Sequence, residues 1–159
     1  MSVGTPATQF LRKADIAFEP VQYDYHPGQE RVALQAAEAV GIAPDHLLKT
    51  LMLEVDGHPA CVVVPGDRTV SMKRAAAAFG GKSASMMPSD KAERITGYRT
   101  GGISPFGQKR KVPVIFESTA MAFTQVGING GKRGLILLLS PEAARAALDA
   151  RALPLCAEN

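Results

Sequence analysis

Residues 49–64 of this 159-residue chain read KTLMLEVDGHPACVVV, and this stretch decides the fold. Its first half is an apolar, β-prone run, and its second half is another such run in which Cys61 is expected to be buried. Asp56-Gly57 between the two runs is a strong signal for a two-residue hairpin turn. The stretch therefore predicts two antiparallel strands that lie side by side.

Helices and strands alternate irregularly on both sides of this hairpin. Thr5-Pro6 and Ser140-Pro141 are N-cap and first-turn signals for the first and last helices, and Pro20 inside a strand-like run predicts an edge strand. The sequence thus predicts an α+β fold, a single domain over residues 1–159 with a mixed, mostly antiparallel sheet and surrounding helices. The expected helices cover about residues 6–14, 32–40, 72–79, 88–97 and 141–150, and the further strands about residues 16–23, 82–87, 112–117, 123–128 and 135–139.

Composition and charge fit an ordinary globular protein. Hydrophobic residues make up 46% of the chain, and a net charge of +3 allows an acidic or phosphate-bearing partner without requiring one. The two cysteines, Cys61 and Cys156, lie far apart and indicate no disulfide framework. No apolar run approaches the roughly 20 residues of a membrane helix, and no signal peptide is recognisable, so we expect a cytoplasmic protein without a membrane partner.

Residues 96–111, TGYRTGGISPFGQKRK, most strongly suggest a binding site. Glycines that permit close backbone approach stand beside a proline and the consecutive cations Lys109, Arg110 and Lys111. Free backbone N–H groups beside cations suit an anion or a developing oxyanion, although a plain structural turn is the alternative. A nucleotide P-loop is disfavoured, because Pro105 and Gln108 interrupt the required pattern.

Two further features could complete a site with this loop. Lys49 stands where a helical turn is expected to pass into a strand, although taken alone a solvent-exposed lysine is the simpler interpretation. The glycine turn at residues 129–134, NGGKRG, adds Lys132 and Arg133, and its alternative is a hairpin loop with a solvated tip. Together with the cations of the first loop, these two would form a rim that positions the phosphates of a nucleic acid.

The usual catalytic sets are absent from the sequence. The three histidines, His26, His46 and His58, adjoin turn signals and are expected to face solvent. There is no Gly-x-Ser-x-Gly motif and no His/Cys cluster with metal-ligand spacing, so we expect neither a metal nor a cofactor. An enzyme with this sequence would work through backbone dipoles, a lysine and the substrate's own groups.

Four motifs, in this order and spacing, resemble the YbaK/EbsC family: Lys49-Thr50-Leu51, Thr96-Gly97-Tyr98, residues 101–109 and residues 130–135. The resemblance covers the chain nearly end to end. This family includes bacterial Cys-tRNA(Pro) deacylases and the editing domain inserted in bacterial prolyl-tRNA synthetases, which hydrolyse the ester that links a wrong amino acid to tRNA. The resemblance implies this activity here, with the acceptor end of an aminoacyl-tRNA as partner and prolyl-tRNA synthetase as a further candidate partner.

The resemblance also implies roles for individual residues. Lys49 matches the family's essential lysine, which holds the acceptor end or the aminoacyl group, and Gly101 and Gly102 match the loop whose backbone contacts the scissile ester. The substrate-binding residues that it implies are Tyr23, Val32, Thr50, Ile103, Ser104, Pro105, Asn129 and Gly130. The expected tRNA phosphate contacts are Lys109, Arg110, Lys111, Lys132 and Arg133.

Two positions depart from the pattern of the cysteine-specific members. Asn129 stands where these members have serine, and Ile136 stands where an acidic residue is common. The expected substrate is therefore Cys-tRNA(Pro) or a tRNA that carries another small amino acid, such as alanine, serine or threonine. The attacking group would be the substrate's own thiol or water. A binding module that has lost hydrolysis and an enzyme for small activated esters are the alternatives.

Overall fold

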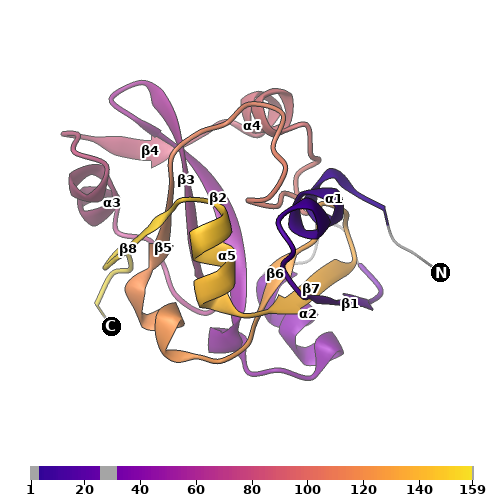
Figure 1. The fold of residues 1–159 in the computed structure, drawn as a ribbon. Coiled ribbons are helices and arrows are strands. Elements are labelled where there is room, and N and C mark those ends of the chain that lie inside the picture. The colour runs from indigo at the N-terminus through magenta and orange to yellow at the C-terminus, as the bar shows by residue number, and fades with distance from the viewer. Residues whose placement is uncertain (1–3, 26–31, 159) are drawn as a thin grey trace.

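The computed structural model describes residues 4–25 and 32–158, with the backbone alone for residues 32–34. Its helices and strands are arranged around one mixed sheet (Figure 1). His26, which was expected to face solvent beside a turn, lies outside the described residues, as does the side chain of Val32, which was expected to contact the substrate. No helix of the described part is long and apolar enough to cross a membrane.

The sheet has eight strands in the part of the chain that is described. They are β1 (Glu19–Gln22), β2 (Leu47–Val55), β3 (His58–Pro65), β4 (Ala84–Met86), β5 (Val114–Glu117), β6 (Val126–Asn129), β7 (Leu135–Leu139) and β8 (Arg151–Leu153). Their order is β1-β7-β6-β2-β3-β5-β8, with β4 attached to β2. The pairs β1–β7, β7–β6, β2–β3 and β2–β4 are antiparallel, and β6–β2, β3–β5 and β5–β8 are parallel. The predicted α+β fold with a mixed, mostly antiparallel sheet is confirmed, and β1 is an edge strand as Pro20 indicated.

The predicted hairpin is the long β2–β3 pair. Its register runs from Leu48 opposite Pro65 to Val55 opposite His58. Asp56 and Gly57 both take positive φ angles, 49° and 82°, as a hairpin turn of type I′ requires. Because β2 already begins at Leu47, Lys49 lies inside the strand and not at the junction that the sequence indicated.

Five α-helices in the described residues pack on the two faces of the sheet: α1 (Pro6–Lys13), α2 (Val32–Val40), α3 (Met72–Ala78), α4 (Ser89–Thr96) and α5 (Pro141–Ala147). Of two short 3-10 helices, Pro44–His46 lies between α2 and β2, and Ser118–Ala122 lies between β5 and β6. The caps are confirmed, since the side chains of Thr5 and Ser140 accept hydrogen bonds from the N–H groups of Thr8 and Ala143, at 3.1 Å each. In Figure 1, α5 crosses the front of the sheet and α3 lies at its left.

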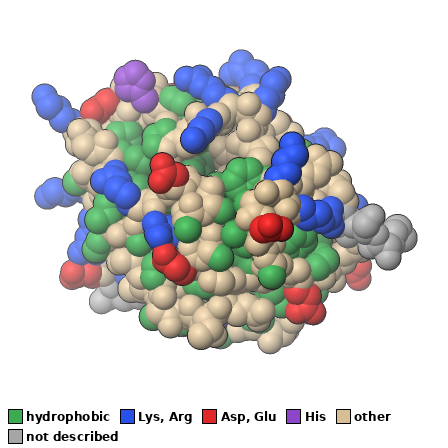
Figure 2. Space-filling view, viewed as in Figure 1, with side chains coloured by type: hydrophobic (Ala, Val, Ile, Leu, Met, Phe, Trp, Pro, Cys, Tyr) green, Lys and Arg blue, Asp and Glu red, His purple; other side chains and the backbone are tan. Residues whose placement is uncertain are grey.

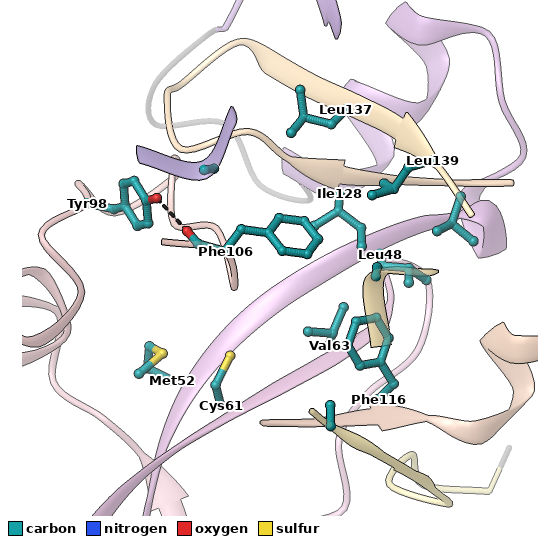
Figure 3. Packing of buried hydrophobic residues seen from close by; sticks show 14 of the residues in the cluster. Leu48, Met52, Cys61, Val63, Tyr98, Phe106, Phe116, Ile128, Leu137 and Leu139 are labelled. Atoms are coloured by element: carbon teal, nitrogen blue, oxygen red, sulfur yellow. Dashed lines mark hydrogen bonds between the residues drawn. The ribbon is translucent and has the colours of Figure 1, made fainter. Parts of the chain in front are cut away.

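The core is divided between the two faces of the central hairpin, as strand alternation requires. On one face, Leu48, Met52 and Cys61 pack with α1, α4 and α5, with Phe106 and with Phe116 (Figure 3). The other face holds Leu53, Val62 and Val64, which pack against α3 and the C-terminal segment. Cys61 is fully buried, as expected.

The C-terminal segment contains structure that the sequence did not reveal. β8 adds to the sheet edge beside β5, and Cys156 is fully buried and bridges to Val70. The buried carboxylate of Glu117 accepts hydrogen bonds from the N–H groups of Leu155 and Cys156, at 2.8 and 2.9 Å. Contacts between such distant positions leave no local sequence signal.

The start of β6 also differs from the expectation. The predicted strand from residue 123 begins only at Val126, because the preceding residues form a 3-10 helix and Phe123 turns its ring onto His46, with the ring centroids 3.8 Å apart. His46 is therefore only partly exposed, whereas His58 faces solvent as expected. Neither histidine lines the pocket described below.

Candidate functional site

A gap in the sheet lies between β6 and β4, which both pair with β2. β6 pairs with the start of β2, at Leu47 and Leu48, and β4 pairs with its end, at Leu53 to Val55. Between them, residues 49–52 have a strand neighbour only on the β3 side, among the residues described. A pocket of about 500 Å³ opens at this gap, and β2, β4, α4 and both glycine motifs contribute to its lining.

Several residues that the sequence singled out meet in this pocket because of the strand register. Asn129 lies opposite Ile136, and the pair formed by Leu48 and Ile128 places Lys49 beside Asn129. Side chains at neighbouring positions of adjacent strands share a face, so Lys49, Asn129 and Ile136 form one row. The predicted site residues that line the pocket are Tyr23, Lys49, Thr50, Gly101, Ile103, Asn129 and Arg133.

Lys49 is a partly desolvated cation in this lining. Burial lowers the pKa of its ammonium, and the nearby Cys156 and Asp67 oppose this effect only in part. It forms no ion pair with any residue that the structure describes. Its position therefore differs from that of a solvent-exposed lysine at a strand start, and it suits an anionic or strongly polar ligand.

Thr50 also lines the pocket, and it carries an unsatisfied hydroxyl. Its Oγ1 is buried and has no hydrogen-bond partner among the described residues. A buried polar atom without a partner costs about 1–3 kcal/mol of stability. A bound ligand that hydrogen-bonds to this hydroxyl would remove that cost.

The two glycine motifs form one assembly beside the pocket. The Nε–H of Arg133 donates to the carbonyl oxygen of Thr100 at 2.8 Å, and the side-chain amide of Asn129 donates to that of Gly101 at 3.4 Å. The backbones also touch, because a Cβ added to Gly102 would lie 2.7 Å from the backbone nitrogen of Arg133. The glycines of the first loop thus permit a close approach of the second turn.

Only part of the predicted oxyanion loop is free to meet a ligand. The N–H of Gly102 donates to the carbonyl oxygen of Arg99 at 2.8 Å, so it is engaged within a turn. The N–H of Gly101 has no hydrogen-bond partner among the described residues, and Gly101 lines the pocket with a φ of 89°. Of the two glycines, Gly101 therefore has the N–H that is available to a ligand, and the catalytic roles expected for both stay predictions.

Other predicted contact residues anchor the loop and do not line the pocket in the described part. Ser104 and Pro105 are buried, and the Ser104 hydroxyl accepts a hydrogen bond from the N–H of Phe106 at 3.3 Å. Tyr98 fixes the same region through a 2.6 Å hydrogen bond to the carbonyl oxygen of Phe106. The Gly130 carbonyl accepts from the Thr5 hydroxyl at 2.6 Å, which ties the second turn to α1. These hydrogen bonds fix the two loops to the core, so the residues support the pocket without lining it.

Most of the predicted phosphate contacts lie outside the pocket. Lys109, Arg110 and Lys111 are exposed beyond the end of α4, and Lys132 is exposed on the second turn. Figure 2 shows Lys and Arg side chains along the top of the molecule, over α4 and the loop that follows it. Arg133 alone among the predicted contacts lines the pocket, and no Asp or Glu occurs in the described lining.

The structure adds lining residues that the sequence analysis missed. Met52 in β2, Ala92 in α4 and Met87 between β4 and α4 are apolar residues that also pack in the core, so no signal in the sequence indicated that they line a site. Met86 is half exposed at the rim. Tyr25 also lines the pocket, and its spacing of two from Tyr23 in an extended segment was a signal that could have found it.

Residues 26–147 match the model of the aminoacyl-tRNA editing domain. The chain belongs to this family. The resemblance noted from the motifs is thereby confirmed.

Two curated relatives resemble this chain over different shares of their own length. This chain is 31% identical over 124 residues to “Putative Cys-tRNA(Pro)/Cys-tRNA(Cys) deacylase EbsC” of Enterococcus faecalis. The aligned region covers 77% of this chain and 76% of that protein. This chain is 32% identical over 83 residues to a proline–tRNA ligase of Maridesulfovibrio salexigens, which covers 52% of this chain but only 14% of the ligase.

Solved structures share the fold of the editing-domain chain. The crystal structure of “a putative trans-editing enzyme for prolyl tRNA synthetase” superposes with a TM-score of 0.82, covering 99% of this chain and 100% of that one. The crystal structure of “hypothetical protein APE2540” gives a TM-score of 0.84 over 96% of this chain and 100% of that one. Sequence identities of 20% and 18% mean that these likenesses concern the fold alone.

Proposed function

We propose that this chain hydrolyses, in trans, the ester bond of a mischarged aminoacyl-tRNA. The observation that carries the proposal is the pocket lined by the partly desolvated Lys49, by Thr50 with its unpartnered hydroxyl and by Gly101 with its free N–H. Membership of the editing-domain family supports it, as does the 31% identity to the relative named a Cys-tRNA(Pro) and Cys-tRNA(Cys) deacylase. Cys-tRNA(Pro), or a tRNA carrying another small amino acid, is the proposed substrate.

Charge in the pocket fits the acceptor end of tRNA. Lys49 and Arg133 are the charged side chains of the described lining, and both are cations. Phosphate and ribose oxygens are acceptors for such donors. The exposed Lys109, Arg110, Lys111 and Lys132 would add longer-range attraction to the acceptor stem, so binding should weaken steeply as salt is raised.

The row beside Lys49 suggests how the amino acid is recognised. Both heteroatoms of the Asn129 side chain are engaged by the loops, since Oδ1 accepts from the N–H of Gly131 at 2.7 Å and Nδ2 donates weakly to carbonyls. Ile136 adds an apolar surface where an acid would have offered a polar one. This favours a small side chain that needs no charged partner.

The protein's own cysteines are unsuited to act as nucleophiles. Cys61 is fully buried, and burial raises the pKa of its thiol to about 12. Cys156 is also fully buried, and burial followed by the charge of Glu117 raises its pKa to about 11. Because the thiolate is the reactive form, water or the substrate's own thiol is the proposed attacking group.

A panel of mischarged tRNAs tests the proposal. Release of amino acid would be measured from Cys-tRNA(Pro), Ala-tRNA(Pro) and tRNAs that carry serine or threonine, with wild type and Lys49→Ala side by side. We expect turnover of at least one substrate by the wild type and a loss of about 100-fold or more in the variant. No turnover of any mischarged tRNA, or full activity of Lys49→Ala, would contradict the proposal.

The engaged N–H of Gly102 favours a second candidate, a module that binds the acceptor end without cleaving it. Tight, salt-sensitive binding of aminoacyl-tRNA without deacylation would support it. Equal rates with full tRNA and with a free aminoacyl ester would instead indicate a small-molecule esterase. Co-elution with prolyl-tRNA synthetase, compared with another synthetase, tests the proposed partner.

A further inference from the structure

The proposed reaction benefits from more than one fixed hydrogen-bond donor at the ester carbonyl. Attack on the ester carbonyl places negative charge on its oxygen, and fixed donors stabilise that charge. Gly102 uses its N–H inside the turn with Arg99, whereas the N–H groups of its neighbours Gly101 and Ile103 have no partner in the described structure. A second donor should therefore lie close to Gly101.

Tyr25 places a hydroxyl at this point. A Cβ added to Gly101 would lie 2.6 Å from the Tyr25 hydroxyl oxygen, so the phenol occupies the space that a side chain at position 101 would need. Both residues line the pocket. The hydroxyl makes no hydrogen bond to any described residue, so it is free to donate to a ligand.

Arg133 holds the ring of Tyr25 in place. Its guanidinium carbon lies 5.2 Å from the ring centroid, within the range of a cation–π contact. The same guanidinium donates its Nε–H to the carbonyl oxygen of Thr100 at 2.8 Å, next to Gly101. The tyrosine ring and the glycine loop are therefore fixed to the same side chain, so the phenol oxygen and the Gly101 N–H keep a defined relative position.

We propose that Tyr25 is a further catalytic residue, whose hydroxyl donates a hydrogen bond to the ester carbonyl oxygen together with the N–H of Gly101. This inference rests on the proposed function. In the step, water or the substrate thiol bonds to the carbonyl carbon, and the carbonyl π pair moves onto oxygen between the two donors. The pair returns as the bond from carbon to the ribose oxygen breaks, and the leaving oxygen takes the proton that the nucleophile loses. Tyr25 keeps its own proton throughout.

Tyr25→Phe tests the role of the hydroxyl, because it keeps the ring that Arg133 and Gly101 contact. Single-turnover deacylation of the best substrate from the tRNA panel would be measured over a range of enzyme concentrations. We expect the maximal rate constant to fall about 100-fold while the half-saturating concentration changes little, since the donor acts mainly in the transition state. A variant rate within about threefold of wild type, or an effect on half-saturation alone, would overturn the inference.

Two controls separate this role from a structural one. An inert amide-linked aminoacyl-adenosine, which resembles the ground state, should bind Tyr25→Phe as tightly as wild type; weaker binding that matches the rate loss would show a disturbed pocket and overturn the inference. Tyr98→Phe removes a hydroxyl that is used inside the protein, at 2.6 Å from the Phe106 carbonyl, so it should lower Tm whereas Tyr25→Phe should not. A wild type inactive on every tRNA would overturn the proposed function and this inference together, whereas an active wild type matched by Tyr25→Phe would overturn the inference alone.

Discussion

Thr50→Val should make the protein more stable and less active. The substitution keeps the β-branched shape and removes a buried hydroxyl that has no partner among the described residues. Relief of the unpaired polar atom is worth about 1–3 kcal/mol of unfolding free energy. For a domain of this size, each kcal/mol raises Tm by about 2–4 °C, so a rise of several degrees is expected in thermal unfolding.

The same change should weaken catalysis, because Thr50 lines the proposed site. The loss of one hydrogen bond to the substrate, about 0.5–1.5 kcal/mol, corresponds to a fall of roughly 2- to 10-fold in kcat/KM for deacylation. Opposite signs for stability and activity are the signature of a polar atom that is kept for a ligand.

Thr96→Val is the matched control. The Thr96 hydroxyl is also buried, but it donates to the Ala92 carbonyl at 2.8 Å and accepts from the N–H of Tyr98 at 3.1 Å. Its loss should therefore destabilise the protein by about 1–3 kcal/mol. If Thr50→Val instead lowered Tm as Thr96→Val does, or left kcat/KM unchanged, the reasoning about Thr50 would be refuted.

Three further outcomes follow from the contacts of single residues. Gly102→Ala should cost about 10-fold or more in activity and lower Tm, because its Cβ would lie 2.7 Å from the backbone nitrogen of Arg133. Gly4→Ala is the control: a Cβ there would have nothing within 4 Å, so neither activity nor Tm should change. Equal behaviour of the two variants would contradict this prediction. Burial alone would raise the pKa of Glu117, but the N–H groups of Thr119, Leu155 and Cys156 lower it to about 2. The stabilisation is thus present above the unfolded-state pKa of about 4.3 and is lost as pH falls toward 2, so Glu117→Gln should unfold more easily at pH 7 and show a flatter acid limb in denaturant titrations. Since burial lowers the pKa of Lys49, tRNA affinity should fall as pH rises through a value below that of a free lysine, and Lys49→Arg should remove this limb in filter-binding titrations.

The parts of the fold that could be predicted from the sequence are those with local signals. The Asp56-Gly57 turn needs positive φ at both residues, and the caps at Thr5 and Ser140 each serve an N–H three residues along the chain. β8 and the burial of Cys156 could not be predicted, because they depend on the pairing with β5 and on the Glu117 carboxylate, both distant in sequence.

The site shows the same division. The motifs led to Lys49, Thr50, Gly101 and Asn129, all of which line the pocket. They also led to Ser104, which the fold buries behind the loop and which lies outside the described lining. A motif identifies which segments meet, but the direction of each N–H and side chain within it depends on the packing of the whole loop.

The gap in the pairing of β2 separates the pocket residues into two groups that lie on different hairpins. The cation and the hydroxyl are carried by a strand that pairs with β3 from Leu48 to Val55, so the long central hairpin sets their positions. The neighbouring positions at Asn129 and Ile136 belong to a different hairpin and can change size or polarity without moving that strand. Under the proposed function, substitutions at Asn129 and Ile136 would change which amino acid is accepted while Lys49 and Thr50 keep their places on β2.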